Sequence, residues 1–558
     1  MADRPDPLLI LPDQLSLEVG PLARAVESGG RGRVLLLESG EWLTRRPYHR
    51  QRIALILLNL RAFGEELQAA GFEVERLEGS GTMRSLLEAW LDAHPDTTLH
   101  GLEPAEREMR LELEPLAAQG RLAWQSNPFF LTDRSMFEEA CGRGAKSRFR
   151  MDTFYRKVRA ATGLLMEPDG SPEGGRISFD AENRKPWKGE PAAPVPPRFA
   201  MTPRRREVAQ EIESRFAAHP GTLDVESLPA TLDDALRLWS WAKSECLEHF
   251  GPYEDAMSRR SRGLFHTRIS PVLNLGRILP RRLVDDVAAM TNLPLPSREG
   301  FIRQVIGWRE FVRHVHDATD GLRAIRGERV ATRATPGDGG WSAWSGGSWS
   351  PSAPPPAQID GGSDANALGP GVGVPPAFWG RESGLACLDH VVSDVWAEGW
   401  SHHITRLMVL GNIASLLDVS PRDLADWFWI AYADAWEWVV EPNVMGMATW
   451  GLGGAMTTKP YIAGSAYIDR MSDYCRGCRF VPKAGRANSC PLTRLYWAFL
   501  DRHEASLRDN PRLGVVMQAM RKRPEAERRG DRAVFARVQS ILIEGQPLPH
   551  DVVSSTAD

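Results

Sequence analysis

The apolar residues of this chain change their spacing partway along it, and that change constrains the fold more than any other feature. Up to residue 135, short apolar runs alternate with longer stretches of helical spacing, such as residues 51–70. From residue 203 onward the spacing is helical and strand patterns are sparse. We therefore predict an α/β domain with a parallel sheet, followed by a large all-α domain. The expected strands are residues 8–11, 34–38, 72–77, 98–102 and 121–125.

The domain boundaries follow the composition. We expect the α/β domain at residues 1–135, a connector at 136–202 and the helical domain at 203–558. Pro and Gly are frequent in the second half of the connector, which is typical of a segment on the surface. Residues 333–376 consist mostly of Gly, Ser, Pro and Ala. Such a composition cannot bury a core, so we expect a low-complexity, mobile surface insertion there.

Charge and hydropathy exclude several classes of protein. The net charge of −4 excludes a uniformly basic nucleic-acid-binding surface, although a local basic groove stays open. No run of 18 apolar residues exists, so we expect no association with the membrane. Pro and Asp interrupt the N-terminal segment where a signal peptide needs an apolar stretch. We therefore expect a cytoplasmic protein, and a monomer.

Four of the six cysteines are candidates for one metal site. Cys475 and Cys478 form a C-x-x-C motif, Cys490 precedes Pro491, and Cys387 lies far upstream. Thiolates bind either zinc or an iron–sulfur cluster, and Cys-Pro at the last ligand is typical of clusters. The spacing by itself leaves three alternatives open: an iron–sulfur cluster, a structural zinc ion, and an ordinary turn.

The segment around these cysteines, MSDYCRGCRF followed by SCPLTRLYWAFLDRH, resembles the cluster-binding end of the iron–sulfur bacterial cryptochromes and photolyases, the prokaryotic (6-4) photolyases among them. LPDQLS, FDAENRK, FHTRISPVLNLGRI, FIRQVIGWREFV, WSHHITRLMVLGNIA and WIAYADAWEWVVEPNVMGMATW are similar to other parts of that family, in the same order. The resemblance covers nearly the whole chain except residues 333–376. It implies the photolyase/cryptochrome fold, with a Rossmann-like N-terminal domain and an all-α FAD-binding domain, and a [4Fe–4S] cluster on the four cysteines.

The resemblance also implies which residues contact FAD. Arg406 and Asp434 lie in apolar segments where a lone charge is costly, so we expect them to pair. The family places both beside the isoalloxazine ring; the alternative is a structural ion pair between two helices. For the residues of the FHTRISPVLN segment, the alternative is a helix cap and a turn. The expected FAD contacts are Tyr253, Thr267, Ser270, Asn274, Gln304, Arg309, Arg406 and Asp434.

Two adjacent histidines, His402 and His403, are the expected catalytic site. Repair of a (6-4) lesion needs a proton donor, and histidine suits that role near neutral pH. In the family the second histidine of the pair is the donor, which here is His403. Leu407 replaces a further histidine of the animal enzymes, so Tyr461 or Tyr467 is expected to assist. The alternative is a pair of histidines bonded to backbone or solvent.

The chain contains 19 Trp but only 8 Tyr. Photoreduction of a flavin needs aromatic side chains that lead from the flavin to the surface. Trp427, Trp379 and Trp436 match electron-transfer positions of the family or lie next to them. Phe428 stands where many relatives have Tyr, which excludes a tyrosyl radical there. We expect one helix over residues 422–440, in which Trp427 and Asp434 share a face.

Asp13 and Glu38 follow the first two predicted strands, at the edge of a parallel sheet where ligands bind. The resemblance implies that they hold an antenna chromophore, 6,7-dimethyl-8-ribityllumazine.

Local basic clusters are candidates for contact with UV-damaged DNA, because phosphates are neutralised by Lys and Arg on one face. For each cluster the alternative is an ordinary solvated face. The clusters are Arg204–Arg206; Arg259, Arg260 and Arg262; Lys146, Arg148 and Arg150; and Arg521, Lys522, Arg523, Arg528 and Arg529.

These observations favour a light-driven (6-4) photolyase that flips the lesion out of the DNA stack toward reduced FAD. The main alternative is a cryptochrome, a blue-light photoreceptor without repair activity. A third hypothesis is a redox-inert nucleic-acid-binding protein with a structural metal.

Overall fold

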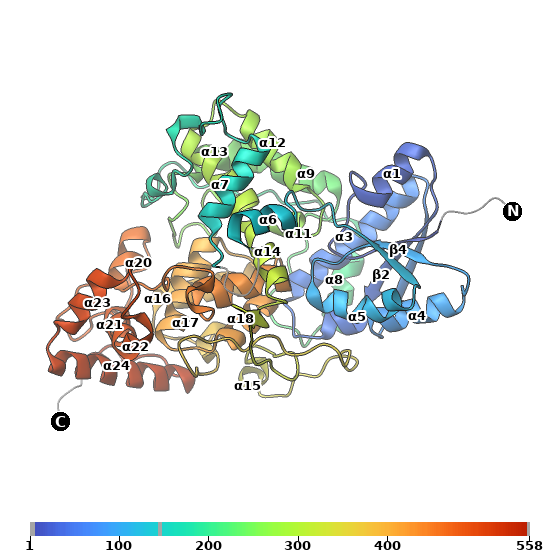
Figure 1. The fold of residues 1–558 in the computed structure, drawn as a ribbon. Helices are drawn as coiled ribbons and strands as arrows, with labels where there is room; N and C mark the ends of the chain where they lie inside the picture. Colours follow the sequence, from blue (N-terminus) through green and yellow to red (C-terminus); the bar gives the residue numbers. More distant parts are fainter. Residues whose placement is uncertain (1–5, 143–147, 555–558) are drawn as a thin grey trace.

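The computed structural model describes residues 6–142 and 148–554. The α/β domain lies at one end of the molecule, and the last helices of the chain lie at the other (Figure 1). Between these ends, the connector and the central helices pack around the elements that carry the predicted site (Figure 1). In the described residues, no helix is long and apolar enough to cross a membrane.

The α/β domain contains a five-stranded sheet in the order β3-β2-β1-β4-β5, and all of its neighbouring strands are parallel. The sequence prediction of five strands is confirmed. The chain direction across the sheet reverses between β1 and β4, where ligands bind in open parallel sheets. The strands are β1 (Leu8–Ile10), β2 (Arg33–Ser39), β3 (Glu73–Gly79), β4 (Leu99–Leu102) and β5 (Leu122–Gln125).

Helices cover the sheet and then form the rest of the molecule. The helices of the α/β domain and connector are α1 (Gly20–Ser28), α2 (Gly40–Thr44), α3 (Arg50–Ala69), α4 (Met83–Asp92), α5 (Arg107–Ala118), α6 (Arg134–Cys141), α7 (Met151–Thr162), η1 (Glu173–Gly175) and η2 (Asp180–Glu182). The first half of the helical domain contains α8 (Pro203–Arg215), α9 (Leu232–Trp241), η3 (Ala242–Cys246), α10 (Leu247–Phe250), α11 (Ser270–Asn274), α12 (Pro280–Ala289), α13 (Leu295–Ile302), η4 (Arg303–Arg309), α14 (Glu310–Ala318), a short hairpin of β6 (Ala324–Ile325) and β7 (Glu328–Arg329), and α15 (Trp341–Ser345).

The second half contains η5 (Pro376–Trp379), α16 (Ala386–Glu398), η6 (Thr405–Gly411), α17 (Asn412–Leu416), α18 (Pro421–Ala431), α19 (Glu437–Glu441), η7 (Pro442–Ala448), η8 (Gly453–Ala455), α20 (Ser465–Met471), α21 (Leu492–Arg502), α22 (Glu504–Leu507), α23 (Gly514–Arg521) and α24 (Glu525–Ile543).

The helix expected over residues 422–440 is interrupted. Helix α18 ends at Ala431, Tyr432 is extended, and α19 begins only at Glu437. Asp434 therefore lies in a connection between two helices, and the expectation that it shares a helical face with Trp427 is wrong. The physical reason is that Asp434 forms an ion pair with Arg406, which an unbroken helix would not position in the same way.

Residues 333–376 do not behave as the composition suggests. Ile359, Ala365 and Val374 are buried in this segment, so the expectation that it buries no core is wrong. The segment also contacts the α/β domain: the hydroxyls of Ser352 and Thr44 lie 2.6 Å apart. In Figure 1 its loops run below α18 toward the α/β domain. Short polar residues and glycines let its backbone lie directly on the surface beneath it.

The two domains are joined by a buried pair of reciprocal helix caps. The backbone N–H of Glu108, in the first turn of α5, donates to Glu437 Oε2 at 2.9 Å. The backbone N–H of Glu437, at the start of α19, donates to Glu106 Oε1 at 3.2 Å. A carboxylate at a helix N-terminus satisfies free N–H groups and complements the helix dipole. Each helix thus receives its cap from the other domain.

Arginines neutralise the carboxylates around these caps. Arg45 bonds to Glu41, Glu108 and Glu112, and all four side chains are buried. Arg46 bonds to Glu108 Oε1 at 2.6 Å. Burial acts to raise the pKa of Glu108, but these two arginines outweigh it and lower the pKa to about 2. Glu108 is therefore an anion at neutral pH.

We expect Arg45→Met to lower the free energy of unfolding by about 3–5 kcal/mol, because it leaves the buried carboxylates of Glu41 and Glu112 without a cation, whereas Glu108 keeps Arg46. Arg198→Met is the matched control: Arg198 also pairs with two carboxylates, but its side chain is 58% exposed. The control should lose about 1 kcal/mol or less. Urea unfolding followed by circular dichroism measures both. Equal losses would contradict a stabilising role for the buried network.

Candidate functional site

Four of the predicted FAD contacts meet at one ion pair. Arg406, in the π-helical segment η6, forms a bidentate pair with Asp434, with N–O distances of 3.0 and 2.9 Å. Ser270 Oγ donates to Asp434 Oδ2 at 2.6 Å, and Asn274 Nδ2 donates to the Asp434 carbonyl at 2.9 Å. Asp434 is buried, whereas the Arg406 side chain is 22% exposed. The pair therefore fixes a cation with one side open to a ligand.

Three imidazoles cluster beside this pair. The ring of His266 stacks on His402 at 4.4 Å between centroids and lies edge-on to His403 at 5.2 Å. Burial lowers the pKa of all three, and the positive charges of Arg303 and Arg406 contribute at His403, whose pKa falls to about 4. The three side chains are therefore neutral at pH 7. Two buried nitrogens, His266 Nε2 and His402 Nδ1, have no hydrogen-bond partner among the described residues.

Glu254 joins the connector to the helical domain next to the histidines. Its carboxylate accepts hydrogen bonds from Gln304 at 2.6 Å and Asn183 at 2.7 Å, and lies 3.3 Å from Arg303. Arg303 also pairs with Asp180 at 3.3 Å. Burial raises the pKa of Glu254 to about 7. Gln304 is thus held by the connector motif that contains Asp180 and Asn183.

Asp180 links the predicted catalytic residues. Its negative charge acts to raise the pKa of both His403 and Tyr461. Burial is the larger effect at Tyr461 and also raises its pKa. The sequence analysis did not select Asp180 or Arg303. A signal for them existed, because Asp180 belongs to the FDAENRK motif and Arg303 precedes Gln304.

Three predicted FAD contacts lie apart from the Arg406–Asp434 pair or make no polar contact there. Tyr253 donates its hydroxyl to the Glu190 carbonyl at 3.3 Å and packs on Phe265. Thr267 is buried next to His266 in the chain. The third residue, Arg309, is the last of η4 and faces the α/β domain.

The guanidinium of Arg309 lies over the rings of Phe130 and Trp438, at 4.4 and 5.3 Å from their centroids. Its positive charge acts on Asp13. Its contacts therefore place it beside the expected antenna site.

The two expected antenna residues differ in their environment. Asp13 follows β1 at the switch point of the sheet, and its Oδ1 is buried without a partner. Burial raises the pKa of Asp13 to about 7. Glu38, at the end of β2, forms a bidentate pair with Arg61, with N–O distances of 2.7 and 3.1 Å. Only Asp13 thus keeps a free oxygen for a ligand.

Two of the three predicted electron-transfer tryptophans belong to one row of rings. Trp427 lies 6.0 Å from Trp396, and Trp396 stacks on Trp379 at 4.9 Å. The indole N–H groups of Trp427 and Trp396 both donate to the Phe378 carbonyl, at 3.0 and 2.9 Å. The sequence analysis missed Trp396, because its neighbours in space come from other helices.

Trp436 lies elsewhere. It packs on Trp42 of the α/β domain at 6.1 Å and beneath the guanidinium of Arg52. Among the described residues, the rings and cations that contact Trp436 do not belong to the row of Trp427, so its position favours packing between the domains over electron transfer.

The four candidate metal ligands line a single cavity. Cys387 lies in the first turn of α16, and the other three cysteines lie between α20 and α21. Burial raises the pKa of Cys387, and the other three thiols raise it further. Among the described residues, only one group of three or more His, Cys, Asp or Glu has all its ligand atoms within 4.8 Å of one another, and it contains no cysteine. A tetrahedral zinc ion would hold its sulfurs ~3.8 Å apart, and no three of these thiols are arranged in that way.

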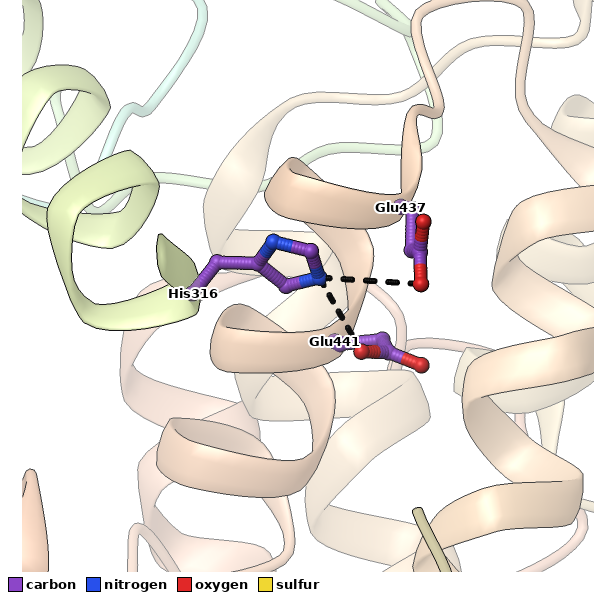
Figure 2. A group of neighbouring side chains, drawn as sticks. All are labelled: His316, Glu437 and Glu441. Carbon is purple, nitrogen blue, oxygen red and sulfur yellow. Dashed lines mark hydrogen bonds and ion pairs between the residues drawn. The ribbon is translucent and has the colours of Figure 1, made fainter. Parts of the chain in front are cut away.

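The group whose ligand atoms do lie this close together consists of His316, Glu437 and Glu441 (Figure 2). His316 Nε2 lies 3.2 Å from Glu441 and 3.8 Å from Glu437. Arg422 bonds to Glu441, and Arg323 lies 3.7 Å from Glu437. Burial acts to raise the pKa of Glu441, but Arg422 and His316 outweigh it and lower the pKa to about 2. Since two arginines already balance the carboxylates, the group extends the buried ionic network and needs no metal.

Many arginines of the predicted basic clusters form ion pairs within the protein. Arg205 is buried and bonds to Asp234; Arg262 pairs with Asp394 and Glu398. These two arginines are not free for phosphates. The C-terminal cluster is similarly paired, with Arg521, Arg523 and Arg528 bonded to Glu504, Asp531 and Asp501. Lys146 lies outside the described residues.

Comparisons with known proteins agree with this arrangement. The family described as "Deoxyribodipyrimidine photo-lyase-related protein" matches residues 8–227. The (6-4) photolyase of Agrobacterium fabrum is 32% identical over 519 residues, which cover 91% of this chain and 93% of that protein.

Two solved structures share the fold. A bacterial class III photolyase from Agrobacterium tumefaciens has a TM-score of 0.53 at 14% identity, over 97% of this chain and 99% of that chain. A cryptochrome from Synechocystis has a TM-score of 0.55 at 14% identity, over 95% and 99%. These likenesses show the fold, and the 32% identity over nearly the full length shows the family. The chain therefore belongs to the photolyase and cryptochrome family.

Proposed function

We propose that this protein repairs (6-4) pyrimidine–pyrimidone photoproducts in UV-damaged DNA by light-driven electron transfer from reduced FAD. The observation that carries the proposal is the convergence of the Arg406–Asp434 pair and three neutral histidines. The similarity to a (6-4) photolyase over nearly the full length favours repair over the cryptochrome alternative. FAD would supply the excited one-electron donor.

The residues at the ion pair fit a polar, electron-rich ring. Asp434 orients the Arg406 guanidinium through two parallel bonds, and Ser270 holds Asp434 in turn. A cation held in this way stabilises negative charge on a neighbouring ring. The unpartnered nitrogens of His266 and His402 also need polar partners, because a buried polar atom without one is costly. A bound cofactor would provide them.

His403 would hold and deliver the proton. Its pKa of about 4 keeps it neutral in the protein without DNA. A lesion brings phosphates, and negative charge nearby raises the pKa of an imidazole. Asp180 acts in the same direction. Binding of the damaged strand would therefore charge His403 just before a proton is needed, with Tyr461, on which Asp180 also acts, as the assisting group.

The DNA surface is proposed around Tyr461 and not at the predicted basic clusters. Arg184 and Arg512 act electrostatically on Tyr461, and both are exposed. Arg470 lies 5.8 Å from the ring of Tyr467. Arg184 also pairs with Asp180 and Asp255, so Arg470 and Arg512 are the stronger candidates to bind the phosphates that flank a flipped nucleotide.

For the four cysteines we propose a [4Fe–4S] cluster, because the wide spacing of the thiols suits a group larger than one zinc ion. The cluster would link α16 to the segment between α20 and α21, which lies far from it in the sequence. For Asp13 we propose contact with the lumazine antenna through its free Oδ1.

Light-dependent repair is the central test. We expect the reduced protein to convert a single-stranded oligonucleotide with one (6-4) lesion to intact bases under blue light only. His403→Asn should slow repair roughly 10²–10⁴-fold, the contribution of a general acid, while flavin content and DNA affinity stay the same. Product is measured by chromatography.

The matched control is His100→Asn, an exposed histidine of the α/β domain, which should repair at the wild-type rate. A wild-type protein whose flavin is reduced by light but which repairs nothing would contradict the photolyase proposal and favour a photoreceptor.

The cluster has its own test. We expect about four irons and four sulfides per chain after anaerobic purification. Cys478→Ser should lose most of the iron and destabilise the C-terminal helices, whereas Cys141→Ser, outside the cavity, should keep it. Metal analysis and the visible absorption spectrum measure both variants. One zinc and no sulfide would disprove the cluster.

A further inference from the structure

We propose that residues 333–376 form the outer end of an electron path, in which Trp341 and Trp344 of α15 accept electrons from a small thiol in solution. The inference rests on the proposed function, since it assumes a light-excited flavin near Arg406. It gives a role to a segment that has no counterpart in the motifs of the family.

The segment extends the row of indoles to the outside of the molecule. Trp341 lies 5.2 Å from Trp379, and Trp344 lies 5.0 Å from Trp341 with its ring plane tilted by 27°. Trp344 is also 6.3 Å from Trp379. With Trp396 and Trp427, five indoles thus follow one another at centroid distances of 4.9–6.0 Å. These separations are those of rings in direct contact.

Burial differs along the row. Trp427 is fully buried and Trp379 is 4% exposed, whereas Trp396, Trp341 and Trp344 are half-buried. A reductant in solution can therefore reach the outer pair, which is the exposed end of the row. A positive charge is less costly on a ring that water reaches than on a buried one, so the outer pair favours a missing electron over the buried rings of Trp427 and Trp379.

The segment is built to lie on this row. Trp379 Nε1 donates to the Gly339 carbonyl at 3.0 Å. The backbone at Gly340 has a φ of +91°, and a Cβ there would lie 3.3 Å from Trp379 Nε1. Asp338 then caps α15 by accepting from the N–H of Gly340 and of Ser342, both at 2.9 Å. Glycine and the cap together fix the tryptophans of α15 against Trp379.

The inner end of the row reaches the predicted flavin site. Trp427 lies 6.2 Å from Tyr432, and the guanidinium of Arg406 lies 4.0 Å from the centre of the Tyr432 ring. Arg406 is the cation of the pair with Asp434. Tyr432 also stacks on Phe428 at 5.2 Å. The row thus continues without a break in aromatic contact from the α15 surface to the Arg406–Asp434 pair.

The electron balance is simple. A flavin held beside the Arg406–Asp434 pair would be the oxidant, and when excited by light it would take one electron from the Trp427 indole. Trp396 then gives an electron to the oxidised Trp427, Trp379 gives one to Trp396, and the outer pair gives one to Trp379. The positive charge is thus left on Trp341 or Trp344. A thiol in solution gives that indole one electron and releases its proton to water. Two oxidised thiols then combine into a disulfide.

The test separates electron transfer from packing. In the Phe variant, Trp341→Phe/Trp344→Phe, both outer indoles are replaced with phenyl rings, which are not readily oxidised. In the Tyr variant, Trp341→Tyr/Trp344→Tyr, they are replaced with rings of the same size as phenylalanine that can be oxidised. We expect the Phe variant to photoreduce its flavin about tenfold more slowly with dithiothreitol, and the Tyr variant to recover much of the rate. After a laser flash, the tryptophan radical should decay faster in the Phe variant.

The matched control is Trp349→Phe in the same segment, which packs on His219 away from the row and should behave as wild type. Circular dichroism checks folding of each variant. A Phe variant with the wild-type rate and radical lifetime would overturn the proposal, as would equal losses in the Phe and Tyr variants. Repair by dithionite-reduced protein tests the photolyase proposal separately, because it bypasses the row and should be unchanged in the Phe variant.

Discussion

Two exchanged carboxylates hold this molecule together. Glu106 caps α19, Glu437 caps α5, and each cap comes from the opposite domain. Buried carboxylates are tolerated only with compensating donors and cations. Arg323 lies 3.7 Å from Glu437. The charge of Arg52 acts on Glu106, but burial is the larger effect and raises the pKa of Glu106 to about 8. The sheet and the helical domain are therefore fixed to each other by directional bonds and not by apolar contact alone, which sets the position of everything that α18 and α19 carry.

The break between α18 and α19 places the predicted site next to this contact between the domains. Within ten residues the chain sends Tyr432 toward the tryptophan row, Asp434 toward Arg406, Trp436 toward the α/β domain and Glu437 into the cap of α5. In a continuous helix, successive side chains are rotated by about 100° per residue. These four side chains could then not make the same four contacts. The fixed joint thus explains why the ion pair, the aromatic row and the domain contact coincide.

Much of the fold and part of the site could be predicted from the sequence. The five strands follow from short apolar runs, and the pairing of Arg406 with Asp434 follows from the cost of a lone buried charge. The broken helix could not be predicted, because the apolar residues of 422–440 keep a helical spacing on both sides of the break. Trp396 was missed for a similar reason, since its partners come from η5 and α18. A sequence motif also does not say which domain a long side chain faces: Arg309 is expected to contact FAD, and its guanidinium lies over Phe130 and Trp438.

The sequence by itself determined the order of the domains, the four cysteines and the pair of histidines, because periodicity, motif spacing and residue chemistry are local properties. Only the tertiary structure decided which charges are free. It neutralises Glu38, Arg205 and Arg262 by partners distant in the chain, and it leaves Asp13 and the histidine nitrogens unpartnered. It also decided that a Gly- and Ser-rich segment carries two ordered indoles. Burial and pairing depend on contacts between residues far apart in sequence, and composition does not specify those contacts.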